Sequence, residues 1–302
     1  MISFNYYFAR NILSTHRIYL HKTAKYVKIK LHTRGKKIIL ELSKMTTLFD
    51  LQGKTAIITG ASSGFGEQFA RSLSGAGARV ILAARRIDKL NDLAANLGNA
   101  KAIQMDVSDK QSVKSCFAEL EKDSEKIDIC VNNAGIAILT PIFEEDDNDN
   151  FESIIQTNLM GVWYVTKAVA NHMKNHGIHG SIINIASING DAFPYKEATA
   201  YATSKAAVIH MAKSLVTELS RHKIRINSIA PGLFHTPMTD HKLGTDQQRQ
   251  EFAEQIPMGF VATPKDLDGA LLLLASNAHS SYITGACITV DGGKSFGTSW
   301  GS

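Results

Sequence analysis

Residues 55–66 read TAIITGASSGFG, an apolar run followed at once by three glycines, and the helix-like stretch EQFARSLSGAG continues at 67–77. A strand, a glycine-rich turn and a helix start form the first βα unit of a dinucleotide-binding fold. Because the first turn of a helix has unpaired N–H groups, it also favours a bound anion. The stretch therefore predicts an α/β fold with a phosphate site at this turn.

The three glycines have separate expected uses in that unit. Gly60 allows the tight turn, Gly64 lets the backbone approach a phosphate without a Cβ, and Gly66 lets the helix lie close to the sheet. The spacing is G-x-x-x-G-x-G, and glycines after a strand also make ordinary turns. The rest of the chain must decide between the two interpretations.

From Leu51 onward, short β-branched runs alternate with longer amphipathic stretches. Helical patterns are clearest at 68–73, 112–120, 151–170 and 199–219. Strands are expected at 55–59, 79–83, 102–105, 127–131, 181–185, 225–229 and 287–290. The strands are apolar at nearly every position, which is typical of a parallel sheet covered on both faces. We predict a single α/β domain over 45–302, a Rossmann-type doubly wound parallel sheet in three α/β/α layers.

Composition excludes several classes of protein. Apolar residues make up 44% of the 302-residue chain, yet the longest apolar run is only Ala270–Ala275, so no membrane span is expected. Cys116, Cys130 and Cys287 are scattered without CxxC spacing, which argues against a zinc site or a disulfide framework. No metal site is predicted, and a reducing, cytoplasmic location fits best.

The net charge of +5 arises in the first 44 residues, which carry ten Lys or Arg and one acid, Glu41. The remaining 258 residues carry 23 basic and 27 acidic side chains, so nucleic acid is not an expected partner. The basic extension 1–44 has three interpretations: a transit peptide to mitochondria or another organelle, a phosphate- or lipid-seeking arm, or a disordered segment upstream of a true start at Met45. We favour the last.

The glycine spacing, with Thr59 before it, resembles the TGxxxGxG signature of the classical short-chain dehydrogenases/reductases. Further landmarks of that family follow in order, and the resemblance covers about residues 50–293. They are Asp106-Val107, Asn132-Asn133-Ala134-Gly135, Asn158, Ser187, Tyr201-x-x-x-Lys205, Pro231-Gly232 and Thr236.

Tyr201 and Lys205, one helical turn apart, are the expected proton-transfer pair. They project from one helix face, and a neighbouring ammonium favours the phenolate form of a tyrosine. The resemblance implies that Tyr201 exchanges a proton with the substrate oxygen while hydride moves to or from nicotinamide, and that Lys205 lowers the Tyr201 pKa and holds the nicotinamide ribose. It also assigns Ser187 to the substrate oxygen, with Ser204 as the alternative hydroxyl, and Asn158 to a water that links Lys205 to solvent.

The resemblance also implies a cofactor-binding set. It consists of Gly60, Ser62, Ser63, Gly64, Phe65, Gly66, Arg85, Asp106, Val107, Asn133, Ala134, Gly135, Tyr201, Lys205, Pro231, Gly232 and Thr236. An acidic residue at the end of the second strand would select NAD, but the strand RVILAARR has Ala84 there, followed by Arg85 and Arg86. A guanidinium grips a phosphate, so we predict NADP(H) with Arg85 as the main contact and NAD(H) as the alternative.

The resemblance implies an enzyme that interconverts a ketone and a secondary alcohol. A 3-oxoacyl thioester is the first expected substrate, and sugars or polyols, steroids and xenobiotic carbonyls are the alternatives. A non-catalytic dinucleotide-binding regulator is the competing class. The segment 234–260 is the expected substrate lid, and a homotetramer or homodimer is implied.

Two other patterns are interpreted as unrelated to function. His172 and His176 lie four residues apart, but no metalloprotease pattern surrounds them, and we expect surface residues. The acidic run at 144–149 lacks the glycine and glutamate positions of a calcium loop and is expected to be solvated.

Overall fold

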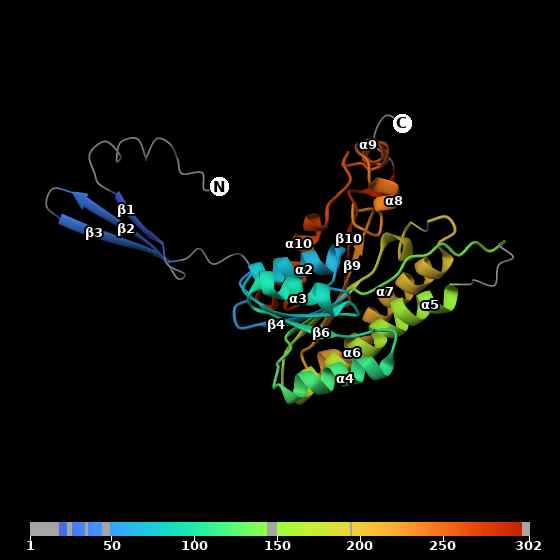
Figure 1. Ribbon diagram of the computed structural model, residues 1–302, viewed down its shortest axis with the longest axis horizontal. Helices are drawn as coiled ribbons and strands as arrows, with labels where there is room; N and C mark the ends of the chain where they lie inside the picture. Colours follow the sequence, from blue (N-terminus) through green and yellow to red (C-terminus); the bar gives the residue numbers. More distant parts are fainter. Residues whose placement is uncertain are drawn as a thin grey trace. The chain divides into compact units, whose positions relative to one another are not determined.

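The computed structural model describes residues 18–22, 26–33, 36–43, 49–143, 150–193 and 195–297, in two units that divide at Asp50 and Leu51. In the first unit, β1 (Ile18–Lys22), β2 (Tyr26–Thr33) and β3 (Lys36–Ser43) form an antiparallel sheet in the order β1-β2-β3 (Figure 1). The three interpretations of the basic extension stay predictions. The expected solvated loop at 144–149 lies outside the described residues.

The second unit is built on a seven-stranded parallel sheet in the order β10-β9-β8-β7-β4-β5-β6. Its strands are β4 (Thr55–Thr59), β5 (Arg79–Ala84), β6 (Ala100–Gln104), β7 (Ile129–Asn132), β8 (Ser181–Ile185), β9 (Arg225–Pro231) and β10 (Cys287–Val290). The order reverses at β4, whose neighbours are β5 and β7. Parallel sheets of this kind bind ligands at that switch point, beyond the carboxyl ends of the strands.

Helices cover both faces of this sheet, which confirms the predicted three-layer Rossmann-type fold (Figure 1). One face carries α2 (Gly64–Gly75), α3 (Ile87–Leu97) and α10 (Asp268–Ala275). The other carries α4 (Lys110–Lys122), α6 (Gly161–Asn175) and α7 (Thr199–Ser220). The shorter elements are α5 (Phe151–Ile155), η1 (Gln156–Met160), η2 (Ile188–Gly190), α8 (Asp240–Leu243), α9 (Asp246–Ala253), η3 (Pro264–Leu267), α11 (Asn277–Ser280) and η4 (Lys294–Phe296).

Successive residues of a strand place their side chains on opposite faces of the sheet, in two separate parts of the hydrophobic core. Ile57 packs with the α4, α6 and α7 side, whereas Ile58 packs with the α2, α3 and α10 side, and both are fully buried. Side chains alternate along a strand, so a strand covered on both faces must be apolar at consecutive positions. Each such side chain contributes about 1.5–3 kcal/mol on burial.

One predicted helix has a different form. The pattern at 151–170 is interrupted by the π-helical turn η1 and continues to Asn175. In the described part of the chain, no helix has both the length and the apolar content that crossing a bilayer requires.

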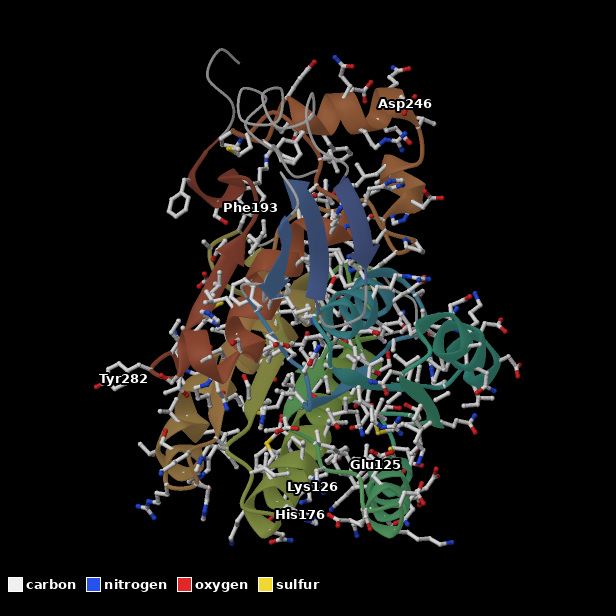
Figure 2. The ribbon with its side chains drawn as sticks, turned by 90° about the vertical axis from the view of Figure 1, so that its left-hand side faces the viewer. Glu125, Lys126, His176, Phe193, Asp246 and Tyr282 are labelled. Atoms are coloured by element: carbon white, nitrogen blue, oxygen red, sulfur yellow. The ribbon has the colours of Figure 1, made fainter. Side chains whose placement is uncertain are left out.

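His172 is not a surface residue, contrary to expectation: it is 3% exposed. Its Nε2 accepts the Ile127 backbone N–H at 3.2 Å, so the ring proton is on Nδ1, which donates to Glu121 at 2.6 Å. His176 reaches the other carboxylate oxygen at 2.9 Å, and these bonds hold the pKa of Glu121 below its usual value. Figure 2 shows His176 at the opposite end of the domain from Phe193.

The three residues Glu121, His172 and His176 bring possible metal-ligand atoms within 4.8 Å of one another. A cation bound at Nδ1 of His172 would replace its proton while Nε2 still faced a backbone donor. The ring would then lack a proton on both nitrogens, which an imidazole resists. The group is better described as a hydrogen-bonded clamp between α4 and α6.

Candidate active site

The glycine-rich turn joins β4 to α2 in the conformation that its sequence requires. Gly60 and Gly64 have positive φ angles of 66° and 60°, which L side chains rarely adopt. Ser63 is the N-cap of α2, but its side chain makes no capping hydrogen bond. The first N–H groups of the helix therefore have no side-chain cap from Ser63, as a phosphate site requires.

Gly66 brings the helix against the turn. A Cβ on Gly66 would lie 2.3 Å from the carbonyl oxygen of Gly60 and 2.7 Å from the Asn133 side-chain nitrogen. Asn133 in turn donates from that nitrogen to the carbonyl oxygen of Thr59 at 2.9 Å. The Thr59 hydroxyl accepts the backbone N–H groups of Asn133 and Ala134, each at 3.0 Å. These contacts tie the ends of β4 and β7 together.

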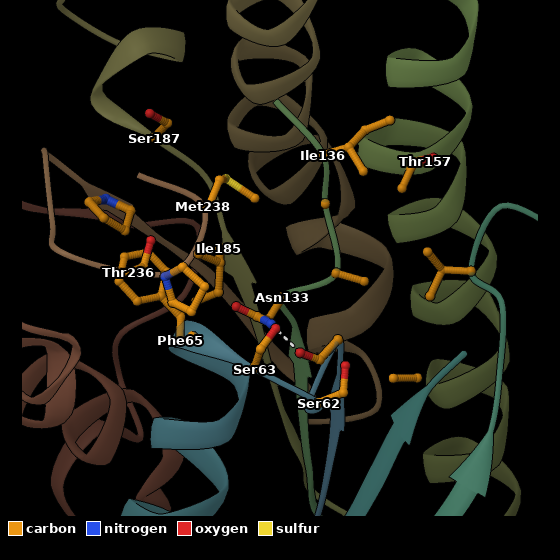
Figure 3. Close-up of a pocket in the computed structure, with 18 of the residues that line it drawn as sticks. Ser62, Ser63, Phe65, Asn133, Ile136, Thr157, Ile185, Ser187, Thr236 and Met238 are labelled. Atoms are coloured by element: carbon orange, nitrogen blue, oxygen red, sulfur yellow. Dashed lines mark hydrogen bonds between the residues drawn. The ribbon is translucent and has the colours of Figure 1, made fainter. Parts of the chain in front are cut away.

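A cavity of about 280 Å³ opens over these strand ends (Figure 3). Figure 3 shows Ser62 and Ser63 at one end and Ser187 at the other, with Asn133 and Ile185 between them. Most of the predicted residues line it: Gly60, Ser62, Ser63, Gly64, Phe65, Arg85, Asp106, Val107, Asn133, Ala134, Gly135, Ser187, Tyr201, Lys205, Pro231, Gly232 and Thr236. Gly66 and Asn158 do not line it and lie behind its wall. The elongated cavity with an uncapped helix start fits a dinucleotide.

Lys205 is 4% exposed, on the inner face of α7. Its Nζ donates to the carbonyl oxygen of Ile185 at 2.8 Å. Burial penalises the charged ammonium and lowers the pKa of Lys205 to about 8. Its charge is therefore sensitive to pH near neutrality.

Tyr201 lies one turn before Lys205, and the Lys205 Nζ is 5.6 Å from the centre of its ring. The expected lowering of the Tyr201 pKa by Lys205 stays a prediction. Burial raises the pKa of Tyr201, and a hydrogen bond with Ser187 partly offsets that rise. Desolvation of the phenolate is the larger of these two effects.

Ser187 follows β8 and caps the short helix η2. Its Oγ accepts the Asn189 N–H at 3.2 Å, and the same side chain lowers the pKa of Tyr201 against the effect of burial. Ser187 and Tyr201 thus both belong to the lining of the cavity. This arrangement suits a pair that holds a single substrate oxygen.

Asn158 is fully buried in the π turn η1. Its Oδ1 accepts the Ile136 N–H at 2.8 Å, and its Nδ2 donates to the Ile136 carbonyl oxygen at 2.8 Å and to Ser204 at 3.2 Å. A Cβ on Gly135 would lie 3.1 Å from Asn158 Oδ1 and 3.5 Å from Lys205 Nζ. Asn158 therefore fixes the backbone beside Lys205.

Two guanidinium groups lie at the end of β5. Arg86 donates to the Ser62 hydroxyl at 2.8 Å and to the Ser63 hydroxyl at 2.9 Å. Arg85 also lines the cavity, and the last strand residue, Ala84, has no carboxylate. The cavity therefore has two cations beside the glycine-rich turn.

Sequence reasoning missed several residues that line this cavity. They are Ala84, Arg86, Met105, Ile136, Thr157, Ile185, Ala186, Pro237 and Met238. Among them, Arg86 can be predicted from the sequence, because it is a second arginine directly after Arg85 at the end of an apolar strand. The apolar residues look like any other core positions in sequence.

A second cavity of about 520 Å³ adjoins the first and shares Ser187, Tyr201, Gly232 and Met238 with it. From the expected lid, His241, Phe252 and Ile256 reach it, but His235 and Met258 do not. Its apolar lining includes Ile138, Leu139, Ile188, Phe193, Leu233 and Phe252. Tyr201 and Ser187 thus lie where a dinucleotide cavity and an apolar cavity meet.

Comparisons with a protein-family model and with individual protein sequences support this interpretation of the site. The chain matches a family model described as enoyl-(acyl carrier protein) reductase over residues 60–295. Nodulation protein G from Rhizobium sp. (strain N33) is 37% identical over 247 residues, 82% of this chain and 98% of that protein. The 3beta-hydroxysteroid dehydrogenase 1 of Eggerthella lenta is 34% identical over 249 residues, 81% of this chain and 94% of that protein.

A solved structure also matches the fold of this chain. The crystal structure of a gluconate 5-dehydrogenase from Burkholderia cenocepacia J2315, in complex with NADP and tartrate, matches with a TM-score of 0.76 and 33% identity. The match covers 82% of this chain and 96% of that one. The family-model match begins at Gly60, so the basic extension 1–44 lies outside it.

Proposed function

The chain belongs to the short-chain dehydrogenase/reductase family and is an oxidoreductase that acts on CH–OH or C=O groups; from this premise we propose that it interconverts a ketone and a secondary alcohol with NADP(H). The observation that carries the proposal is that Ser187 and Tyr201 both line the dinucleotide cavity and the apolar cavity. A substrate oxygen held by this pair would have the cofactor cavity on one side and the apolar cavity on the other.

The chain's own residues then have distinct tasks. Ser187 and Tyr201 hydrogen-bond the substrate oxygen, and the Tyr201 hydroxyl transfers or accepts its proton. A bound nicotinamide would supply or accept the hydride and, in its oxidised form, would add a positive charge that favours the phenolate. Lys205 adds charge on the same face of α7, and Asn158 positions the backbone at Gly135 and Ile136 beside it.

The preference for NADP(H) over NAD(H) rests on the end of β5. Arg85 and Arg86 can both reach a ribose phosphate at this edge of the cavity, and Ala84 presents no carboxylate to repel it. We assign Arg86 a role beside Arg85, because its bonds to Ser62 and Ser63 fix its guanidinium over the turn.

The substrate we propose first is a 3-oxoacyl thioester, whose acyl chain suits an apolar cavity of about 520 Å³. A steroid is the second candidate, since one relative is named for hydroxysteroid dehydrogenation and the lining accepts a bulky apolar body. A polyol would leave many hydroxyls against apolar side chains, which is unfavourable.

We also propose a homotetramer or homodimer assembled through the helices that carry Asn158 and Tyr201. Thr203 and Ala206 on α7 are exposed and small, which permits close packing against a second copy. A cytoplasmic location is proposed because Cys116, Cys130 and Cys287 are all free thiols.

The test is turnover of a panel of 3-oxoacyl thioesters, hydroxysteroids and sugar acids with NADPH, NADH and their oxidised forms, followed at the nicotinamide absorbance. Reduction of a ketone or oxidation of a secondary alcohol is expected, with a lower KM for NADPH than for NADH. Tight NADPH binding without turnover of any class would instead favour a dinucleotide-binding regulator.

A further inference from the structure

We propose that the apolar cavity ends in an anion-binding subsite formed by Lys242 and Lys294, so that the substrate carries an acidic group remote from its reacting carbon. The inference deepens the proposed function and rests on it, since the same cavity contains Ser187 and Tyr201. It names a chemical class: an apolar ketone or alcohol with a terminal carboxylate or phosphate.

The charge of the cavity lining is one-sided. Among its described residues there are three lysines, Lys196, Lys242 and Lys294, and one histidine, His241, but neither aspartate nor glutamate. The other residues are mostly apolar. A neutral substrate would gain nothing from these ammonium groups, whereas an anion would gain directly.

Aromatic rings hold two of these ammonium groups in place. The Nζ of Lys242 lies 4.4 Å from the centre of the Tyr195 ring, and the Nζ of Lys294 lies 5.3 Å from that of Phe193. A ring face attracts a cation without neutralising it. Figure 2 shows Phe193 toward the same end of the domain as Asp246, which begins the lid helix α9.

Both ammonium groups keep unused hydrogen-bond donors. Lys242 donates to the Tyr195 hydroxyl at 3.3 Å, and Lys294 donates to the Gln255 carbonyl oxygen at 3.0 Å. An ammonium has three donors. Neither lysine is paired with a carboxylate in the described part of the chain. Among the described residues, these two half-buried cations at one apolar cavity have no carboxylate partner, and a terminal anion on the substrate would supply one.

Lys196 differs from this pair. Its side chain is 86% exposed and is already bonded to Glu197 at 3.2 Å. We therefore leave it out of the subsite. The subsite then draws on two separate elements, α8 for Lys242 and η4 for Lys294.

The experiment compares matched anionic and neutral substrates with NADPH. One pair is 7-oxooctanoate and its methyl ester, flanked by the shorter 5-oxohexanoate and longer 9-oxodecanoate pairs. The second pair is acetoacetyl-coenzyme A and the acetoacetyl thioester of N-acetylcysteamine. Wild type should have a higher kcat/KM for the anionic member. A preference limited to the first pair identifies a carboxylate, and one limited to the second identifies a carrier phosphate.

The variants Lys242→Met and Lys294→Met should each lower the ratio of anionic to neutral kcat/KM about ten-fold, equivalent to about 1.4 kcal/mol. Lys167→Met is the matched control, because Lys167 also lies over an aromatic ring, 5.8 Å from the centre of Trp163, but outside both cavities. It should leave the ratio unchanged. An equal ratio in wild type and both variants would overturn the subsite.

A binding measurement keeps this test separate from that of the proposed function. Decanoate and decan-1-ol are titrated into the wild-type protein saturated with NADP+, with thermal unfolding as the readout. Decanoate should stabilise wild type more than decan-1-ol, and Lys242→Met with Lys294→Met should remove the difference. If no substrate turns over but decanoate still stabilises wild type more than decan-1-ol does, the proposed reaction is wrong and the proposed subsite is supported. If decanoate stabilises wild type no more than decan-1-ol does, the proposed subsite is wrong, whichever substrate the enzyme reduces.

Discussion

The Nζ of Lys205 is held 2.8 Å from the carbonyl oxygen of Ile185, at the point where β8 ends beneath α7. The ammonium is almost completely buried, and no carboxylate is bonded to it among the described residues. Burying such a charge lowers the stability of the fold. Proteins keep such unfavourable residues where their activity requires them.

Replacing Lys205 with Met should stabilise the fold at neutral pH while it abolishes turnover. The folded pKa of about 8 lies below the unfolded value near 10.4, so the unfolded chain binds more protons between these pH values. Wild-type stability therefore rises from about pH 8 to about pH 10, and below pH 8 the full cost, of order 3 kcal/mol, remains. Urea unfolding from pH 7 to pH 10 should show this slope in wild type and not in the variant.

Substituting Tyr201→Phe should reduce kcat by about 10²-fold or more, because it removes the hydroxyl that we propose transfers the proton. The dissociation constant for NADPH, measured by fluorescence, should change little, since only one oxygen is removed. Turnover close to that of wild type would show that the proton moves through another group.

Substituting Ser187→Ala should shift the pH profile of alcohol oxidation. The hydrogen bond from Ser187 lowers the pKa of Tyr201, so its loss raises that pKa and moves the midpoint of kcat/KM to higher pH. A fall of about 10²-fold in kcat should accompany the shift. Ser187→Thr keeps the hydroxyl and should restore the midpoint, which a purely structural role would not explain.

Substituting Arg85→Ala and Arg86→Ala should each weaken NADPH binding by about 10- to 100-fold and leave NADH binding nearly unchanged, because a charge-assisted bond to phosphate contributes about 1.5–3 kcal/mol. Isothermal titration with both cofactors measures the two effects. Equal losses for NADPH and NADH would mean that the arginines support the turn rather than the phosphate.

Substituting Gly66→Ala should destabilise the domain by at least about 2 kcal/mol, since its Cβ would collide with the backbone oxygen of Gly60. The control is Gly75→Ala in the same helix, where a Cβ meets nothing within 4 Å. That change should be neutral or stabilising by up to about 1 kcal/mol. Chemical denaturation of both variants distinguishes a local clash from a general intolerance of α2 to alanine.

Much of the fold and of the cavity lining could be predicted from the sequence, for a simple reason. Glycines and polar residues that follow apolar strands stand out against their neighbours, as Gly60, Asp106 and Asn133 do. The order of the strands then brings these ends together at one edge of the sheet.

What could not be predicted depends on contacts between distant segments. Ile185 and Met238 look like ordinary core residues, although both line the dinucleotide cavity. The direction of the Tyr201 pKa shift follows from its depth of burial, which the spacing to Lys205 does not show. His172 was misplaced because its partner Glu121 comes from another helix.

The π turn from Gln156 to Met160 has a consequence for how this gene can change length. Such a turn accommodates one residue more than an α-helical turn, and Asn158 within it faces the backbone of Ile136. Deleting one residue here would let the turn return to α-helical geometry, so that the helical segments on either side stay in phase while Asn158 loses its present position. A one-residue deletion in this stretch would therefore disturb the site through Asn158 while the rest of the helix keeps its packing.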